Sequence, residues 1–210
     1  MTDSNHRSPR ASGCVHDIAA VLALRTGSMP TAKEALLLRR APADEFQPGL
    51  FNMPMGHLRR GETYDHAAIR ELREETGIRL RAEQLVYVGD YYLDVPKEGT
   101  GISVPFHFRQ YVANLPKGIG EKDIKLSKDH TEARFIGFET LRKALYAPVM
   151  QFTLPDAKLL RLVTMLHRSF PINGSVPQEF KANLGALLSD PHAGLRFKPT
   201  PITGGFPDWP

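Results

Sequence analysis

GHLRRGETYDHAAIRELREETGI, residues 56–78, is the stretch that decides the fold, because it places Glu71, Glu74 and Glu75 within one turn of a predicted helix. At about 100° per residue, the three carboxylates fall within one narrow arc of the helix surface. Like charges at this spacing repel one another and destabilise an isolated helix by about 0.2–0.5 kcal/mol per pair. A multivalent cation would offset that repulsion, so the sequence predicts a metal site.

The ends of this helix are also marked in the sequence. Thr63 follows Glu62 where a helix start favours a capping hydroxyl and negative charge. Gly77 follows the charged turn, where a helix end favours a left-handed residue. We therefore expect a helix over residues 64–76. Its opposite side carries the residues expected to face a core: Ile69, Leu72 and Thr76.

Carboxylate oxygens are the ligands that hard cations prefer, so we expect Mg²⁺ at this site, with Mn²⁺ as the alternative. Zn²⁺ fits less well because the sequence has no cluster of cysteine and histidine at ligand spacing. Arg70 adjoins Glu71 and lies four residues before Glu74, where its guanidinium can hold a carboxylate by paired hydrogen bonds. The alternative is a solvated helix of mixed charges, but such a helix does not require the flanking glycines at these distances.

The stretch resembles the signature of the Nudix hydrolase family, and it does so at every fixed position. In chain order these are Gly56, five residues, Glu62, seven residues, Arg70-Glu71-Leu72, one residue, Glu74-Glu75, one residue and Gly77-Ile78. The resemblance implies an α/β fold in which this loop, helix and loop sit on an α/β/α sandwich with a mixed sheet. It also implies an enzyme that cleaves a nucleoside diphosphate linked to another group.

The resemblance further implies a role for each residue of the motif. Glu74 and Glu75 are expected to bind the divalent cation, and Glu71 to be either a third ligand or the base for the attacking water. Gly56 would offer its backbone carbonyl to the metal, and Arg70 would orient Glu71. Two more positions are expected to support the structure of the motif: Glu62 in the loop and Gly77 at the helix end. Because a pyrophosphate is a polyanion that repels hydroxide, such a site has to neutralise phosphate oxygens and position a water molecule.

The residues just before the motif depart from the family pattern. Family members commonly have Trp-x-x-Pro-Gly-Gly, and this chain has Phe51-Asn52-Met53-Pro54-Met55-Gly56. Phe51 is an acceptable aromatic replacement. Met55 stands where the first glycine would permit backbone angles that methionine resists, so we expect a changed loop geometry there without the loss of a ligand.

A further acidic residue is expected from residues 129–136, where the family resemblance implies a metal ligand or general base outside the motif. Glu132 is the first candidate and Asp129 the second. The alternative for Glu132 is a solvent-facing loop residue. His130 is interpreted as a structural residue or a hydrogen-bonding neighbour.

The formal net charge of +4 and the isoelectric point near 9.2 fit an anionic partner. Three basic residues near the motif are expected to bind substrate phosphates: Arg39, Arg59 and Arg60. Simple exposed loop residues are the alternative interpretation of Arg59 and Arg60. Because the basic residues are dispersed and no aromatic-basic RNA motif occurs, we expect a nucleotide-type small molecule as the partner rather than nucleic acid.

The 210 residues and 41% hydrophobic content allow one substantial core, and the chain divides into four predicted regions. Residues 1–14 are expected to be a disordered N-terminal arm, and residues 15–150 the Nudix hydrolase domain. Residues 151–190 are expected to form a C-terminal helical extension packed on that domain, and residues 191–210 a Pro/Gly-rich tail with Trp209 near its tip. Within the domain, strands are expected over residues 18–24, 35–38, 85–95 and 104–113, and a solvated loop over residues 114–128.

Cys14 is the only cysteine, so no intrachain disulfide is possible and a reducing compartment is expected. No apolar stretch approaches membrane-spanning length. We therefore expect a soluble, cytoplasmic protein with no membrane partner. The sequence is compatible with a homodimer.

Two functions from different classes follow from these features. The first is a Mg²⁺-dependent pyrophosphohydrolase that acts, by water attack on phosphorus, on a nucleoside triphosphate, a nucleotide sugar or an ADP-ribose type of substrate. The second is a Nudix-fold regulatory protein that binds a nucleotide without hydrolysing it. A protein that only binds is expected to lose motif carboxylates, and because none is lost here, the enzyme is favoured.

Overall fold

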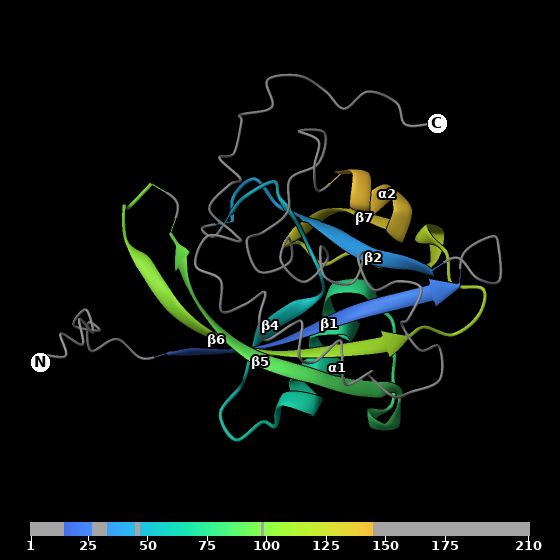
Figure 1. Ribbon diagram of the computed structural model, residues 1–210, viewed down its shortest axis with the longest axis horizontal. Helices are drawn as coiled ribbons and strands as arrows, with labels where there is room; N and C mark the ends of the chain where they lie inside the picture. The colour runs from blue at the N-terminus through green and yellow to red at the C-terminus, as the bar shows by residue number, and fades with distance from the viewer. Residues whose placement is uncertain (1–14, 27–32, 45–46, 98, 145–210) are drawn as a thin grey trace, which may run out of the picture.

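Seven strands form one mixed sheet in the computed structural model, which describes residues 15–26, 33–44, 47–97 and 99–144 (Figure 1). The strands are β1 (His16–Thr26), β2 (Lys33–Arg40), β3 (Phe51–Asn52), β4 (Met55–His57), β5 (Leu85–Pro96), β6 (Ser103–Asn114) and β7 (His130–Gly137). The sheet has the order β3-β2-β1-β6-β5, with β4 paired to β1 and β7 paired to β2. β1 and β6 run parallel and the other pairs are antiparallel, so the predicted α/β class with a mixed sheet is confirmed.

β1 lies at the centre of this sheet and reads as an almost continuous apolar run. Its residues from Ile18 to Leu24 are buried, as expected for a strand that is covered on both faces. The strand extends beyond this run at both ends, because backbone pairing with β6 continues to His16 and pairing with β2 continues to Thr26. Apolar periodicity therefore located the strand but not its ends.

β4 was not expected as a strand, and its position explains how the motif reaches the sheet. β1 pairs with β2 only over Leu24–Thr26, and near its other end it pairs with β4 instead. The short β4 thus occupies the place beside β1 that β2 leaves free. This arrangement carries Gly56 to a point directly opposite Ala19, on the face of the sheet that α1 covers.

Helix α1 (Tyr64–Thr76) has the predicted bounds. Thr63 caps its first turn by accepting a hydrogen bond from the amide of His66, and Gly77 ends it with a φ of 75°. The helix lies against one face of the sheet (Figure 1) and buries Ala67, Ala68, Leu72 and Thr76 there. Ile69, which was also expected to face the core, is only half-buried and is not part of the buried cluster that contains Ala67, Ala68 and Leu72.

The segment between β6 and β7 is more ordered than the solvated loop that the sequence suggested. It contains a short 3-10 helix, η2 (Glu121–Asp123), and a second short 3-10 helix, η1 (Ala82–Gln84), precedes β5. After η2, the amide of Lys125 donates to the carbonyl of Thr76 at 2.9 Å, and the amide of Ser127 donates to the carbonyl of Glu75 at 3.2 Å. These bonds tie the segment to the C-terminus of α1, whose last carbonyls need partners.

Helix α2 (Phe138–Ala144) follows β7 and packs against β7 and β2. It was not expected from the sequence, although its Phe138 and Leu141 are buried. The arm over residues 1–14, the helices over residues 151–190 and the tail over residues 191–210 were predicted for segments that lie outside the described residues.

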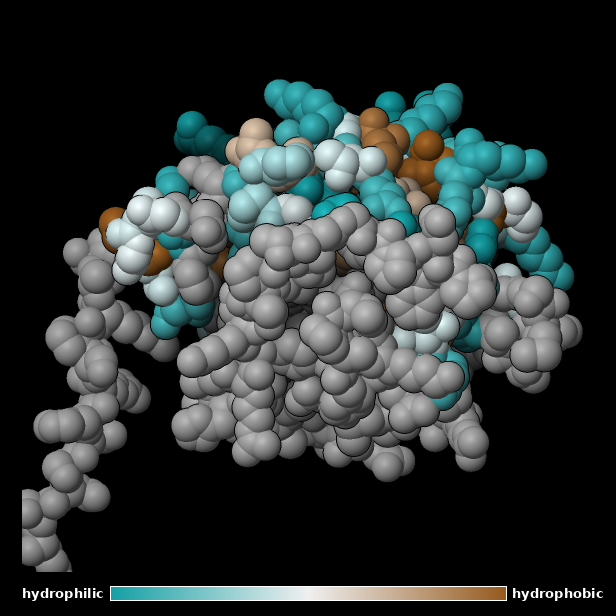
Figure 2. Space-filling view, turned by 90° about the horizontal axis from the view of Figure 1, so that it is seen from above, coloured by the Kyte–Doolittle hydropathy of each residue, from teal (hydrophilic) through white to brown (hydrophobic). Residues whose placement is uncertain are grey.

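The surface of the described residues in Figure 2 consists mostly of hydrophilic side chains, with only small separate hydrophobic patches. In the described part of the chain, neither helix combines the length and the apolar run that crossing a bilayer takes.

Candidate active site

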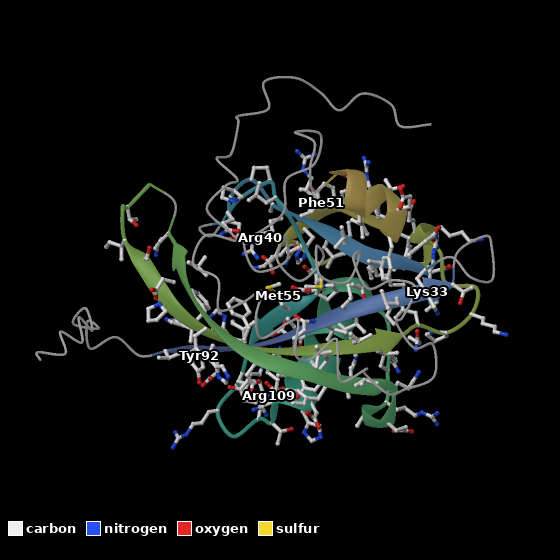
Figure 3. The ribbon with its side chains drawn as sticks, in the orientation of Figure 1. Lys33, Arg40, Phe51, Met55, Tyr92 and Arg109 are labelled. Carbon is white, nitrogen blue, oxygen red and sulfur yellow. The ribbon has the colours of Figure 1, made fainter. Side chains whose placement is uncertain are left out.

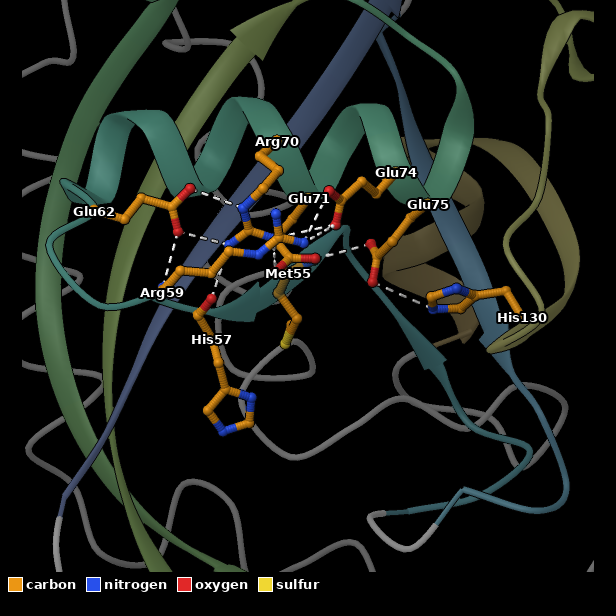
Figure 4. Close-up of polar contacts among 9 residues, drawn as sticks. All are labelled: Met55, His57, Arg59, Glu62, Arg70, Glu71, Glu74, Glu75 and His130. Atoms are coloured by element: carbon orange, nitrogen blue, oxygen red, sulfur yellow. Dashed lines mark hydrogen bonds and ion pairs between the residues drawn. The ribbon is translucent and has the colours of Figure 1, made fainter.

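Glu71 and Glu75 of α1 direct their carboxylates toward β4 and are largely shielded from solvent, whereas Glu74 is more exposed (Figure 4). A Cβ added to Gly56 would lie 2.1 Å from the Cδ atom of Glu71, far inside van der Waals contact. The missing side chain at position 56 therefore allows the Glu71 carboxyl group to pack against the backbone of β4. This close approach is the reason that the chain needs glycine there.

Met55 fits the site without the strain that its replacement of a glycine suggested. Among the described residues, the only non-glycine residue with positive φ is Gln47, so the backbone of Met55 has an ordinary conformation. Its amide donates a hydrogen bond to Oε2 of Glu75 at 3.1 Å. Its side chain packs against the buried cluster that contains Ile18 and Phe106. The expectation of a changed loop geometry at Met55 is therefore not supported by the backbone angles.

Arg70 is the centre of the hydrogen-bond network in the motif (Figure 4). Its guanidinium donates two bonds of 2.7 Å to the two oxygens of Glu62. It also donates to Oε1 of Glu71 at 2.5 Å, to the backbone carbonyl of His57 at 2.9 Å and to Glu74 at 3.2 Å. The paired bonds thus go to Glu62 in the loop, and a single bond goes to the expected ligand Glu71. Arg70 lowers the pKa of Glu62 to about 2, mainly through these hydrogen bonds.

The three carboxylates of the helical turn have different environments. The side chains of Glu71 and Glu75 are 15% and 12% exposed, whereas that of Glu74 is 45% exposed and accepts two bonds of 3.0 Å from Arg59. Burial raises the pKa of Glu71. Burial and then the negative charge of Glu71 raise the pKa of Glu75 well above its usual range, although the Met55 amide acts in the opposite direction.

These residues fit a divalent cation. Among the described residues, no three His, Cys, Asp or Glu side chains lie close enough together to bind one metal ion. Glu71 is instead paired with Arg70, and Glu74 with Arg59. Glu75, in contrast, has no arginine or lysine within ion-pair distance among the described residues, although the charge of Arg40 lowers its pKa from a longer distance. A buried carboxylate beside a second carboxylate is costly without a positive charge. The available donors are all oxygens, which suits a hard cation such as Mg²⁺ or Mn²⁺.

Outside the motif, the structure brings His130 to the carboxylates and leaves Glu132 elsewhere. The Nε2 atom of His130 lies 3.8 Å from Oε1 of Glu75, and the charge of Asp129 contributes to the raised pKa of Glu75. Glu132 pairs across the strands with Arg39, at 3.9 Å, and hydrogen-bonds with Arg134.

A shift in strand register separates these two residues. Arg39 pairs with Glu132, but its neighbour Arg40 pairs with His130, so a bulge lies between the two arginines. The bulge turns His130 toward α1 while Glu132 shares the side of Arg39. Asp129, the second candidate, adjoins His130 in the chain, and its charge acts on Glu75.

The three arginines expected to bind phosphate have different positions. Arg59 lies on Glu74 with a side chain that is 63% exposed, and Arg60 is exposed in the same loop. Arg39 donates to the carbonyl of Gly49 at 3.1 Å in addition to its contact with Glu132. The structure therefore brings Arg59 to the carboxylates and uses Arg39 in other contacts.

Residues 16–162 match the family model described as NUDIX domain. This chain belongs to the Nudix hydrolase family. Its activity is accordingly hydrolysis of a phosphoric anhydride bond, as the motif indicated. The match continues past residue 150, and the boundaries of the four predicted regions stay predictions.

Solved Nudix structures share this fold at low sequence identity. RenU, a Nudix hydrolase from M. smegmatis, has a TM-score of 0.54 at 21% identity, over 76% of this chain and 90% of its own. The NUDIX domain of Shewanella oneidensis NrtR, in complex with ADP ribose, has a TM-score of 0.56 at 11% identity, and the match covers 80% of this chain and 99% of that domain. A bifunctional NMN adenylyltransferase/ADP ribose pyrophosphatase from Francisella tularensis, in complex with AMP and a Mn ion, has a TM-score of 0.51 at 20% identity. The match covers 74% of this chain and 42% of that protein. No curated protein sequence matches the chain.

The start of the Nudix helix is held by a polar cluster that sequence reasoning missed. The hydroxyl of Tyr64 donates to Asp17 at 2.5 Å and lies 2.8 Å from Nδ1 of His107, while the guanidinium of Arg109 lies 4.3 Å above the Tyr64 ring. The backbone carbonyl of Asp17 also accepts a bond from the amide of Leu58 in the loop of the motif. Figure 3 places Arg109 on the β6 side of β1, away from Arg40. No local pattern links these residues, because they come from β1, α1 and β6.

Proposed function

We propose that this chain is a Mg²⁺-dependent pyrophosphohydrolase that cleaves a nucleoside diphosphate linked to another group, by attack of water on phosphorus. The observation that supports it best is the buried pair of carboxylates, Glu71 and Glu75, packed against the glycine backbone of β4. Mn²⁺ is the alternative cation, and a Mn ion accompanies AMP in the structurally similar Francisella protein.

Four groups would hold the cation: the backbone carbonyl of Gly56 and the carboxylates of Glu71, Glu74 and Glu75. A bound Mg²⁺ would neutralise phosphate oxygens and lower the pKa of a water molecule that it binds. Glu71 is also suited to accept the proton of the attacking water, because burial raises its pKa toward the range in which a general base works well. Arg70 keeps Glu71 in one position while it accepts that proton.

Arg59 is the residue that we propose to bind a substrate phosphate first. Its partner Glu74 is nearly half exposed, and the Arg59 side chain is more exposed still. An exposed ion pair is worth little, typically below 1 kcal/mol. Exchange of Glu74 for a phosphate oxygen would therefore cost Arg59 little and would free Glu74 from Arg59, with its 3.2 Å bond from Arg70 retained. Arg60, in the same loop, is a second candidate for the outer phosphate.

The substrate class is a nucleotide with a diphosphate link. ADP ribose and AMP accompany two of the structurally similar proteins, which makes ADP-ribose the first compound to test. Nucleoside triphosphates and nucleotide sugars complete the panel. Assays contain either Mg²⁺ or Mn²⁺, and the wild-type protein is expected to hydrolyse at least one compound.

The decisive variant is Glu75→Gln, which keeps the shape of the side chain and removes its charge. Turnover is expected to fall by at least a hundredfold, whereas Glu83→Gln, at an exposed glutamate paired with Arg81, is expected to leave it unchanged. Hydrolysis in ¹⁸O-labelled water then identifies the phosphorus atom that is attacked.

The regulatory alternative makes a different prediction for the same panel. A protein that only binds a nucleotide would show a ligand-dependent rise in melting temperature and no turnover with either cation. That result would replace the hydrolase proposal with the binding one. Neither turnover nor a thermal shift on the whole panel would contradict both.

A further inference from the structure

A chain of hydrogen-bonding groups begins at the turn before β7 and ends at Glu75. The amide of Asp129 donates to Oγ of Ser127 at 3.3 Å, and this Oγ lies 3.2 Å from Nδ1 of His130. The other ring nitrogen of His130, Nε2, faces Oε1 of Glu75 at 3.8 Å (Figure 4). The His130 side chain is only 3% exposed, and the charges of Arg40, Asp129 and Asp44 also act on it.

The direction of this chain follows from its two ends. The Asp129 amide can only donate, so it occupies a lone pair of Ser127 and leaves the hydroxyl hydrogen of Ser127 available for Nδ1 of His130. At the other end, a deprotonated Nε2 would point its lone pair at the carboxylate of Glu75. A proton on Nε2 removes that repulsion and fixes the neutral tautomer that accepts from Ser127.

Backbone hydrogen bonds fix the position of this series of side chains relative to α1. The amide of Ser127 donates to the carbonyl of Glu75 itself, and the amide of His130 donates to the carbonyl of Ser127. The turn that carries the imidazole is therefore bonded to the residue that the imidazole faces. Glu75 is then held from two sides, because its Oε2 accepts from the amide of Met55 while its Oε1 faces His130.

We propose that His130 is a positioning residue for Glu75: its Nε2–H holds Oε1 in the orientation that binds the divalent cation, with Ser127 fixing the tautomer. This inference rests on the proposed function of Glu75 as a metal ligand. The present 3.8 Å separation is longer than a hydrogen bond, and such contacts are often long without ligand and shorten in the complex. Partners that orient a metal ligand typically contribute 10–100-fold in metal affinity.

The alternative is that His130 only fills space at the start of β7. A space-filling residue would affect the stability of the fold, and any replacement that restores stability would restore every other property. A positioning residue instead requires a donor at the place of Nε2. Glutamine supplies an amide N–H near that place, while alanine supplies none.

The test compares His130→Ala with His130→Gln by Mn²⁺ titration, with free Mn²⁺ followed by electron paramagnetic resonance in the absence of substrate. His130→Ala is expected to weaken Mn²⁺ binding at least tenfold, and His130→Gln to restore affinity to within about threefold of wild type. His66→Ala, at an exposed histidine on α1, is the matched control and is expected to bind Mn²⁺ as wild type does. With the substrate found in the panel, His130→Ala is expected to lower kcat at saturating Mn²⁺ by less than it lowers the affinity for Mn²⁺.

Several results would overturn the proposal. It fails if His130→Ala binds Mn²⁺ as wild type does, or if the alanine and glutamine variants are weakened equally. If His130→Ala does not fold, Ser127→Ala decides, because it keeps the ring and removes the hydroxyl that fixes the tautomer. Ser127→Ala is expected to weaken Mn²⁺ binding at least threefold, and an unchanged affinity refutes the proposal that Ser127 and His130 together position Glu75.

The failure of the proposed function has a separate signature. Wild type would then show no Mn²⁺ binding and no hydrolysis, and the role of His130 would fall with it. If wild type binds Mn²⁺ and hydrolyses a substrate while the His130 variants match it in affinity, only the positioning role is refuted.

Discussion

A methyl group at position 56 would occupy the place of the Glu71 carboxyl group. The added Cβ would lie 2.1 Å from Cδ of Glu71, and ordinary carbon contacts begin near about 3.5 Å. In Gly56→Ala the carboxyl group therefore has to move by about 1.4 Å or the backbone of β4 has to shift by a similar amount. Either movement pulls Glu71 away from Arg70, whose bond to it is now 2.5 Å long.

The expected cost has two parts. Overpacking of a filled site typically costs about 1–3 kcal/mol, and a lost hydrogen bond between charged groups costs about 1.5–3 kcal/mol. The side chain of Glu71 can relax partly, so we expect a loss of about 1–3 kcal/mol in the free energy of unfolding. Catalysis is expected to suffer more, since a displacement of about 1 Å at a reacting group can cost about a hundredfold in rate.

The assay is urea unfolding of four proteins: wild type, Gly56→Ala, Glu71→Ala and the double variant. Glu71→Ala removes the atoms that the new methyl group would meet, so Gly56→Ala should cost less than about 0.5 kcal/mol in that background. Gly137→Ala is the matched control, because a Cβ there meets nothing within 4 Å. An equal cost of Gly56→Ala with and without Glu71 would refute the argument from close approach.

Three further predictions concern the same domain. Arg70 lowers the pKa of folded Glu62 from 4.5 to about 2, so the stability that Glu62 contributes is complete above pH 4.5 and is lost as the pH falls toward 2. The difference in unfolding free energy between wild type and Glu62→Gln should therefore shrink over that range. A difference that stays constant with pH would contradict this prediction. Asn52 is fully buried, and neither of its amide atoms has a hydrogen-bond partner among the described residues. Asn52→Leu should therefore raise the melting temperature, and a fall of several degrees would show that the amide has a partner. Gly77→Ala should cost about 1–2 kcal/mol in urea unfolding, since the residue has a φ of 75° and a Cβ would lie 3.1 Å from Lys125; a neutral result would refute the left-handed cap.

The motif helix could be predicted closely because its signals are local. Thr63 and Gly77 define its two ends through the cap and the left-handed φ, and neither depends on distant parts of the chain. The strands were located by their apolar runs, but their ends depend on backbone pairing with neighbours. The three-residue strand β4, which pairs with β1, has no such run, so the sequence did not show that Gly56 lies opposite Ala19.

The site was harder to predict wherever it depends on strand register. Nothing in the sequence marks the bulge between Arg39 and Arg40, yet this bulge brings His130 to Glu75 and leaves Glu132 beside Arg39. The partners of Arg70 were also only partly predicted. Its spacing from Glu74 indicated a contact within the helix, whereas its paired bonds reach back to Glu62 in the loop.

The bonds from Lys125 and Ser127 to the last turn of α1 make that turn and the start of β7 a single unit of local unfolding. Neither amide can exchange its hydrogen with solvent until its bond to the turn that carries Glu75 opens. Their exchange rates in deuterated water therefore report the opening of these two bonds. A cation bound to Glu75 would oppose that opening, so both amides should exchange more slowly as the cation concentration rises.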